Sequence, residues 1–219
     1  MARRPNADSA RTVDAIISAA LALLNESRRV DDLSLRQVAQ RANVGLSTVQ
    51  YYFSTRDALL DACLDGYHQR LVALAKEVSE SLAQTSGDRR IFLEHVVRRF
   101  FRFARSEKTL IQLRVSTTLT HREQRTLARD ELGAMIIREA ANVLAPHTGA
   151  SVAETRFAIH SMSALIVRSA LASDVEVKTL TDLPMPEAID AIEDQLVRAG
   201  MQLLAMDAAP SGQTAARVP

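Results

Sequence analysis

The chain has 219 residues, of which 47% are hydrophobic and 24% are charged, the ordinary composition of a soluble globular protein. It contains Gly 7, Pro 6 and no Trp, and it is rich in Ala, Leu and Arg, so we expect an all-α fold. No run of residues reaches the roughly 18 apolar residues that a membrane span requires. The single cysteine, Cys63, cannot form an internal disulfide, which agrees with a reducing compartment. Together these features predict a cytoplasmic protein.

The charges are distributed unevenly, although the net charge is only +1. Residues 88–129 hold eleven Lys/Arg and four Asp/Glu, whereas residues 174–194 hold seven acids and one lysine. A surface that binds nucleic acid must therefore be a local patch.

The first half of the chain contains four predicted helices. Residues 1–8 form a polar arm that we expect to be mobile. Apolar residues at helical spacing then predict a helix over 9–26. Ser34 is expected to cap a short helix that ends near Arg41, and a second short helix extends from Gly45 to about Tyr52. Ser54 and Asp57 have the spacing of a capping box at the start of the fourth helix.

Further helices are predicted at about 56–84, 88–106, 108–119, 121–144, 151–173 and 186–206. The tail after residue 206 has no apolar face to bury, so we expect it to be disordered.

The segment S-L-R-Q-V-A-Q-R-A-N-V-G-L-S-T-V-Q-Y-Y-F-S-T-R, residues 34–56, contains three arginines and no carboxylate. Two short helices that cross steeply need a small residue at the crossing and a residue that tolerates positive φ in the turn; Ala39 and Asn43 fit these places. Val38, Val44 and Val49 are expected to face inward. The outward side chains are then uncharged or basic, as a phosphate-lined groove requires: Arg36, Gln40, Ser47, Thr48, Gln50 and Tyr51. The alternative, a solvated basic surface with core aromatics, leaves the turn chemistry unexplained.

The run from Ser34 to Leu60 resembles the DNA-binding region of the TetR family of bacterial transcriptional regulators, and the resemblance extends over about residues 12–64. It combines the helix-turn-helix spacing, the aromatic residues before Phe53 and the basic residue Arg56. Asn43 stands where Gly is common, and Gly45 stands where Ser or Thr often caps the second helix. Gln50 stands where Tyr is frequent; because its amide can bond adenine N6 and N7 together, the preferred operator is expected to differ.

The resemblance implies a sequence-specific regulator, most simply a homodimeric repressor that a small-molecule effector releases from a palindromic operator. It implies a helix-turn-helix domain over 1–54, a helical ligand-binding and dimerisation domain over 55–206, and a tail over 207–219. The expected DNA contacts are Ser34, Arg36, Ser47, Thr48, Gln50, Tyr51, Tyr52 and Arg56. Gln50 and Tyr51 are the base-edge candidates, Tyr52 and Arg56 are assigned to phosphate, and Phe53 is expected to pack inward. A packing role is the alternative for each tyrosine.

Candidate effector contacts lie mainly on the helix predicted over 88–106. Phe92, His95, Arg99 and Phe103 form a strip that could line a pocket, and the alternative is a solvated helix edge. Arg114 and His160 are weaker candidates, and Tyr67, on the helix predicted over 56–84, is a residue beside which an effector could insert. Cys63 is expected in the core, and no two histidines have the three- or four-residue spacing of a helix-borne metal site.

An enzyme is disfavoured because the chain lacks a G-x-S-x-G elbow, a phosphate loop, a dinucleotide fingerprint and H-E-x-x-H. No cofactor is expected. A helical DNA-binding or structural module without ligand control remains the alternative.

Dimerisation is expected through residues 151–173 and 186–206, in which Ile189, Ile192, Leu196, Ala199 and Leu203 form an apolar seam. The alternative is that this seam packs inside one subunit. The helix over 56–84 is expected to join the two domains as one rod and to transmit the effector signal, as the resemblance implies.

Overall fold

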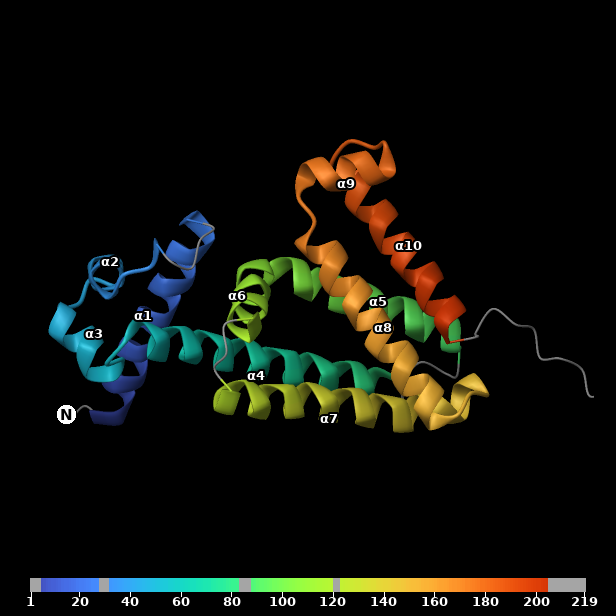
Figure 1. The fold of residues 1–219 in the computed structure, drawn as a ribbon, viewed down its shortest axis with the longest axis horizontal. Coiled ribbons are helices and arrows are strands. Elements are labelled where there is room, and N and C mark those ends of the chain that lie inside the picture. The colour runs from blue at the N-terminus through green and yellow to red at the C-terminus, as the bar shows by residue number, and fades with distance from the viewer. Residues whose placement is uncertain (1–4, 28–31, 83–87, 120–122, 205–219) are drawn as a thin grey trace, which may run out of the picture. The chain divides into compact units, whose positions relative to one another are not determined.

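The computed structural model describes residues 5–27, 32–82, 88–119 and 123–204. These residues form ten α-helices and no strand, which confirms the all-α prediction (Figure 1). The helices are α1 (Pro5–Ser27), α2 (Leu35–Arg41), α3 (Leu46–Tyr52), α4 (Arg56–Leu82), α5 (Arg89–Ser106), α6 (Lys108–Leu119), α7 (Glu123–Thr148), α8 (Val152–Leu171), α9 (Asp174–Thr181) and α10 (Glu187–Leu203). None of these helices is both long and apolar enough to cross a membrane.

The helices fall into two compact units. The first contains α1, α2, α3, α4 as far as Ala73, and α6, while the second contains the rest of α4, α5, α7 from Leu127, and α8 to α10. This grouping reflects packing, and the functional boundary expected between residues 54 and 55 stays a prediction.

Local sequence signals set the ends of the short helices in the first unit. The Ser34 hydroxyl oxygen accepts a hydrogen bond from the backbone N–H of Gln37 at 3.2 Å, and the Gln37 side chain accepts one from the Ser34 N–H at 3.1 Å. This capping box satisfies two of the N–H groups that a helix start leaves unpaired. Asn43 has a φ of 54°, the left-handed conformation expected for the turn. Gly45 is the N-cap of α3, as predicted.

The core of the helix-turn-helix is apolar. Val38, Val49 and Phe53 are buried, and Ala39 is buried where α2 meets α3. Val44 was expected to face inward, but it is only half-buried. Ile16, Ala20 and Leu24 of α1 are buried as well, so α1 presents one apolar face.

Three boundaries differ from the predictions. The helix α1 begins at Pro5, so residues 5–8 are helical, although we expected them in a mobile arm. The Thr55 hydroxyl accepts from the Ala58 N–H at 3.1 Å, so the side chain that caps α4 is one residue later than the predicted Ser54. The helix α7 extends to Thr148, beyond the expected residue 144. The predicted disordered tail lies outside the described residues.

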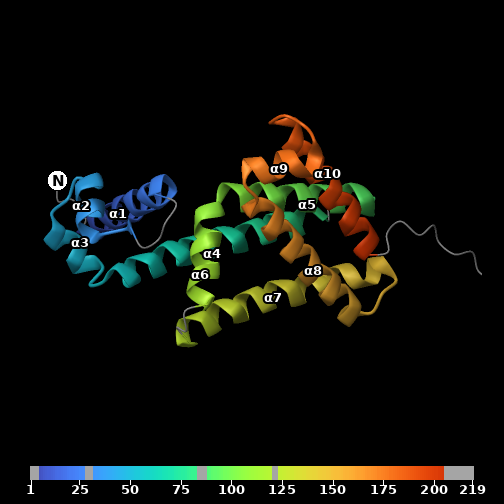
Figure 2. The same cartoon turned by 45° about the horizontal axis from the view of Figure 1, so that its top comes forward.

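The second unit is built around α5, α8 and α10, which contact one another (Figure 2). Gly200 lies at this meeting point, since a Cβ added there would lie 3.4 Å from the Met162 sulfur and 3.5 Å from a Val97 methyl group. An added Cβ would therefore make ordinary van der Waals contacts there, which shows that α10 is in direct contact with both α5 and α8 at this residue.

The short helix α9, which the sequence did not predict, connects α8 with α10. Its Val177 forms a buried cluster with Ala172 and Ala188, and Ile189 and Ile192 pack against this cluster. Leu196 is also buried within the chain. These three members of the predicted dimer seam therefore pack inside one subunit, as the alternative held, while Leu203 remains 41% exposed.

Candidate nucleic-acid interface

The outward face of the helix-turn-helix is polar. Tyr51 is 82% exposed, and Arg36, Gln40, Ser47 and Gln50 are exposed as well. Thr48 is half-buried. Because residues 34–56 contain no carboxylate, this face presents donors and acceptors without the negative charge that a phosphate backbone would repel.

The position of α3 is fixed by its buried side. Val49 and Phe53 are one turn apart and both are buried, so the helix is anchored along this side. The Val44 N–H also bonds the Ala39 carbonyl at 3.0 Å, which closes the turn between α2 and α3. Gln50 and Tyr51 follow Val49 around the helix and consequently project outward.

The two adjacent tyrosines differ in their surroundings. The Tyr52 hydroxyl lies 3.0 Å from the Ser9 hydroxyl on α1, and its ring meets the Tyr51 ring edge-on with 5.0 Å between centroids. Tyr52 therefore already has an intramolecular role, and its assignment to a phosphate remains a prediction. Tyr51 remains available to a base edge.

Two further predicted contacts lie at helix starts. The Ser34 hydroxyl is engaged in the α2 cap, so it would contact DNA only while sharing that bond. Arg56 opens α4 and is half-buried, with its Nε 4.0 Å from a carboxylate oxygen of Asp57. Arg41 pairs with Glu26 of α1 at 2.5 Å, and this pair connects α2 to α1.

The comparisons with known proteins agree with this geometry. The family model described as bacterial regulatory proteins, tetR family, matches residues 16–63. Residues 16–63, which include α2 and α3, are thus similar to bacterial regulators of the TetR family.

A relative from Xanthobacter autotrophicus, described as an uncharacterized HTH-type transcriptional regulator in the dhlA 5' region, is 45% identical over 62 residues. That match covers 28% of this chain and 30% of the relative, so the chain matches less than a third of the relative's length.

Two solved structures extend the likeness in fold to both units. A transcriptional regulator from Rhodococcus sp. Rha1 matches 90% of this chain and 99% of its own, with 20% identity and a TM-score of 0.65. The TetR-family repressor FadR of Thermus thermophilus, solved with lauroyl-CoA, matches 91% of this chain and 98% of its own, with 20% identity and a TM-score of 0.57. At these identities the likeness establishes the fold.

The candidate effector residues of α5 do not form one strip. Phe92 is buried and packs with Leu74 and Val78 of α4. Phe103 lies against the same cluster, whereas His95 and Arg99 are exposed. The Arg99 guanidinium lies 2.5 Å from Glu77, so an anionic ligand would compete with this carboxylate.

The other effector candidates lie elsewhere. Tyr67 is buried in the first unit, where burial raises the pKa of its hydroxyl and the nearby Arg114 opposes that increase. His160 of α8 is exposed beside Phe157, which is itself 71% exposed. The seven candidates are thus divided among separate places, and their assignment remains a prediction.

Sequence reasoning missed the ion pairs between α5 and α10. Arg98 and Arg102 bind Glu193, and Arg98 also binds Asp194. The signal was present in the uneven charge, because the basic excess of residues 88–129 and the acidic excess of residues 174–194 include these partners. What the sequence did not reveal was that these distant segments pack side by side.

Proposed function

We propose that the chain is a ligand-responsive homodimeric repressor that a small-molecule effector releases from a palindromic operator. The exposed, acid-free face of α3 carries the DNA-binding part of this proposal. Gln50 and Tyr51 on this face suit the major groove, which distinguishes base pairs by their donors and acceptors. Selection from a library of random DNA duplexes tests it, since a specific reader enriches one recurring sequence.

The dimer part rests on an apolar surface of α8. Phe157 is 71% exposed and Leu165 is 42% exposed, while Thr155, Ala158, Met162 and Ile166 bury the other side of the same helix. A second copy of the chain would cover these two side chains. Two helix-turn-helix motifs related by a two-fold axis would then face two half-sites about one helical turn, or a multiple, apart.

The effector is expected to be apolar. Leu74, Val78 and Phe92 are buried together, and the partly buried residues packed against them are Val96, Phe100, Phe103 and Leu144. This cluster brings α4, α5 and α7 together, and its three phenylalanines offer an apolar ligand a suitable surface. The Thermus thermophilus repressor of the same fold was solved with lauroyl-CoA, which makes fatty-acyl compounds a reasonable first probe.

Thermal unfolding with a series of acyl chains tests this part of the proposal. A ligand that binds only the folded chain adds about 2.7 kcal/mol to the free energy of unfolding when its concentration is one hundred times its dissociation constant. The unfolding temperature therefore rises. A shift that grows with chain length supports an apolar site. The alternative, a helical DNA-binding module without ligand control, predicts no shift with any member of a broad library.

The signal is proposed to pass along α4, because this helix starts at Arg56 beside the helix-turn-helix and continues to Leu74 and Val78 of the apolar cluster. The helix α6 braces it within the first unit. Arg70 of α4 binds Glu107, the residue directly before α6, through two bonds of 2.7 and 2.8 Å, and Thr109 of α6 bonds Asn25 of α1. A displacement of α4 would therefore be shared with α1.

Thermodynamic reciprocity tests this coupling. A coupling free energy of 1–3 kcal/mol would weaken operator binding by roughly 5–150-fold when effector is bound. Saturating operator must then weaken effector binding by the same factor. Calorimetric titrations of effector with and without operator measure this, and equal affinities in both would contradict the proposed coupling.

A further inference from the structure

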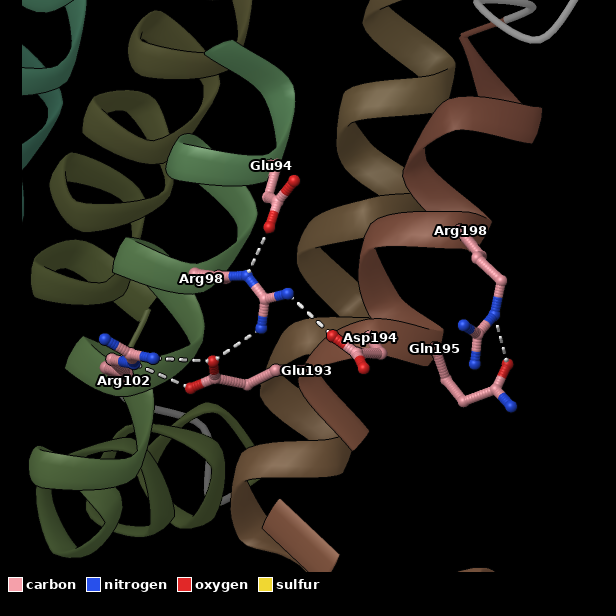
Figure 3. Close-up of polar contacts among 7 residues, drawn as sticks. All are labelled: Glu94, Arg98, Arg102, Glu193, Asp194, Gln195 and Arg198. Carbon is pink, nitrogen blue, oxygen red and sulfur yellow. Dashed lines mark hydrogen bonds and ion pairs between the residues drawn. The ribbon is translucent and has the colours of Figure 1, made fainter. Parts of the chain in front are cut away.

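A group of charged residues joins α5 to α10 in the second unit, and we call it the Glu193 cluster: Glu94, Arg98, Arg102, Glu193 and Asp194. Glu193 is only 2% exposed, and it is the one charged residue whose side chain is so deeply buried among the described residues. Its carboxylate accepts hydrogen bonds from Arg98 Nη1 at 3.0 Å, Arg102 Nε at 2.7 Å and Arg102 Nη2 at 2.9 Å (Figure 3).

The cluster leaves Glu193 ionised. Burial alone would raise its pKa, but the guanidinium groups of Arg102 and Arg98 outweigh burial and hold the pKa below its ordinary value. Each of the three guanidinium nitrogens of Arg98 has an acidic partner, because Arg98 also binds Glu94 at 3.0 Å and Asp194 at 2.6 Å. The charges at this contact are therefore arranged in one specific pattern.

The contacts near Gly200 show that α10 runs antiparallel to α5. Gly200 lies against Leu93 and Val97, near the start of α5, while Glu193 lies against Arg98 and Arg102, nearer its end. Apolar contacts around a glycine would tolerate a shift of α10 along α5. A shift by one turn in one direction would instead bring Glu193 beside Glu94, and a shift in the other direction would separate it from Arg98.

The outward side of α10 depends on this register. Figure 3 shows Gln195 and Arg198 on the side of α10 that faces away from α5, and the structure joins them by a hydrogen bond of 3.3 Å. Gln195 follows Glu193 by about half a helical turn, and Arg198 follows it by more than one turn. Any slip of Glu193 along α5 therefore moves the outward residues of α10 relative to those of α8.

We propose that the Glu193 cluster fixes the register of α10 on α5, and that dimer formation through α8 and the outward side of α10 depends on this register. The inference rests on the proposed homodimer for its second half only. A buried ion pair adds little net stability compared with an apolar replacement, because desolvation offsets the attraction, so its main effect here is to select one arrangement of two helices.

The informative substitution is Glu193→Met, which places an apolar side chain in the buried position. The two arginines are not left buried and unpaired, because Arg98 keeps Glu94 and Asp194, and Arg102 is 65% exposed and can turn to water. We therefore expect Glu193→Met to fold, with the helical circular dichroism of the wild type. Glu193→Gln, which preserves shape and removes the charge, is the second variant if Glu193→Met fails to fold.

The register is measured by the distance between spin labels on cysteines introduced at Arg90 and Glu187, exposed residues at the starts of the two antiparallel helices. Cys63 is buried and its thiol pKa is raised to about 12, so it should not react with the label. Labelled chain is diluted into excess unlabelled chain, so that only distances within one chain are observed. A slip of one turn changes this distance by about 5 Å.

For Glu193→Met we expect a broadened or second distance and a dimer dissociation constant raised at least about tenfold, which corresponds to about 1.4 kcal/mol. Glu94→Gln is the matched control, because it removes an ion pair of the same Arg98 that stays within α5, and it should keep the single distance. A wild-type distance in Glu193→Met would overturn the register role. A changed distance with wild-type dimer affinity would overturn the link to dimerisation. A monomeric wild type would contradict the proposed dimer, while the label distance would still test the register.

Discussion

Gln50 is an exposed amide on the outward side of α3, where it is the proposed reader of a base edge. Its exposed amide can bond N6 and N7 of one adenine, and this pair of bonds is worth about 1–3 kcal/mol of discrimination. We predict that Gln50→Ala lowers the preference at one operator position by that amount. Competition binding with operators substituted one base at a time measures it, and Gln40→Ala on α2 is the matched control. Equal losses on operator and random DNA would remove Gln50 from the set of base readers.

Thr55 offers a second test at the scale of one residue. Its hydroxyl caps α4 through the Ala58 N–H, and loss of a cap costs typically about 1 kcal/mol. Thr55→Ala should therefore lower the free energy of unfolding by about that much, while Ser54→Ala, one residue earlier, should leave it unchanged. Urea denaturation separates the two variants, and the opposite order would return the cap to Ser54.

The buried thiol of Cys63 is expected to make the stability of the folded chain depend on pH. Burial is the main cause that raises the pKa of its thiol to about 12, while the pKa of the thiol in the unfolded chain is about 8.5. Between these values the unfolded chain loses a proton that the folded chain keeps, so this residue makes the folded state less stable as pH rises above about 8.5. At pH 8 a thiol reagent should react slowly with the native chain and rapidly in guanidinium. Fast native labelling would show that Cys63 is accessible.

At the scale of elements, the sequence predicted the structures whose causes are local. The cap at Ser34, the turn at Asn43 and the inward Phe53 depend on neighbours within a few residues, and all three are confirmed. The helix α9 was missed because it has eight residues and only Val177 is buried, so it carries almost no periodic signal. Contacts between distant helices were equally hidden, since nothing in residues 93–102 reveals that Glu193 will lie among them.

The exposed face of α8 leads to a prediction about the dimer. Leu196→Glu would place a charge inside the subunit, since Leu196 is buried, so a substitution on the surface is the cleaner test. Phe157→Glu should raise the dimer dissociation constant more than about tenfold, because aromatic residues at interface centres commonly contribute more than 1.4 kcal/mol. Sedimentation measures the constant. Val175→Glu on α9 is the control, because Val175 is apolar and 76% exposed but lies on another helix. Equal effects of both substitutions would remove α8 from the interface.

At the scale of the whole molecule, the proposed repressor combines a DNA-binding face in the first unit with an effector site and a dimer surface in the second. The first unit presents the acid-free helix-turn-helix and braces α4 with α6. The second unit offers an apolar cluster for an effector and an apolar α8 face for a second copy. Because α4 contributes residues to both units, a change at the cluster can alter the operator affinity of a dimer without any effector contact to DNA.

The most direct test of this account is selection of DNA from a random duplex library, followed by measurement of the affinity and stoichiometry on the selected site. We predict a palindromic sequence, two chains per duplex, and binding at least about a thousandfold tighter than to random DNA at the same salt concentration. We also predict that Gln50→Ala changes which base is preferred within each half-site. Recovery of no recurring sequence, with equal affinity for selected and random duplexes, would contradict sequence-specific recognition by α3.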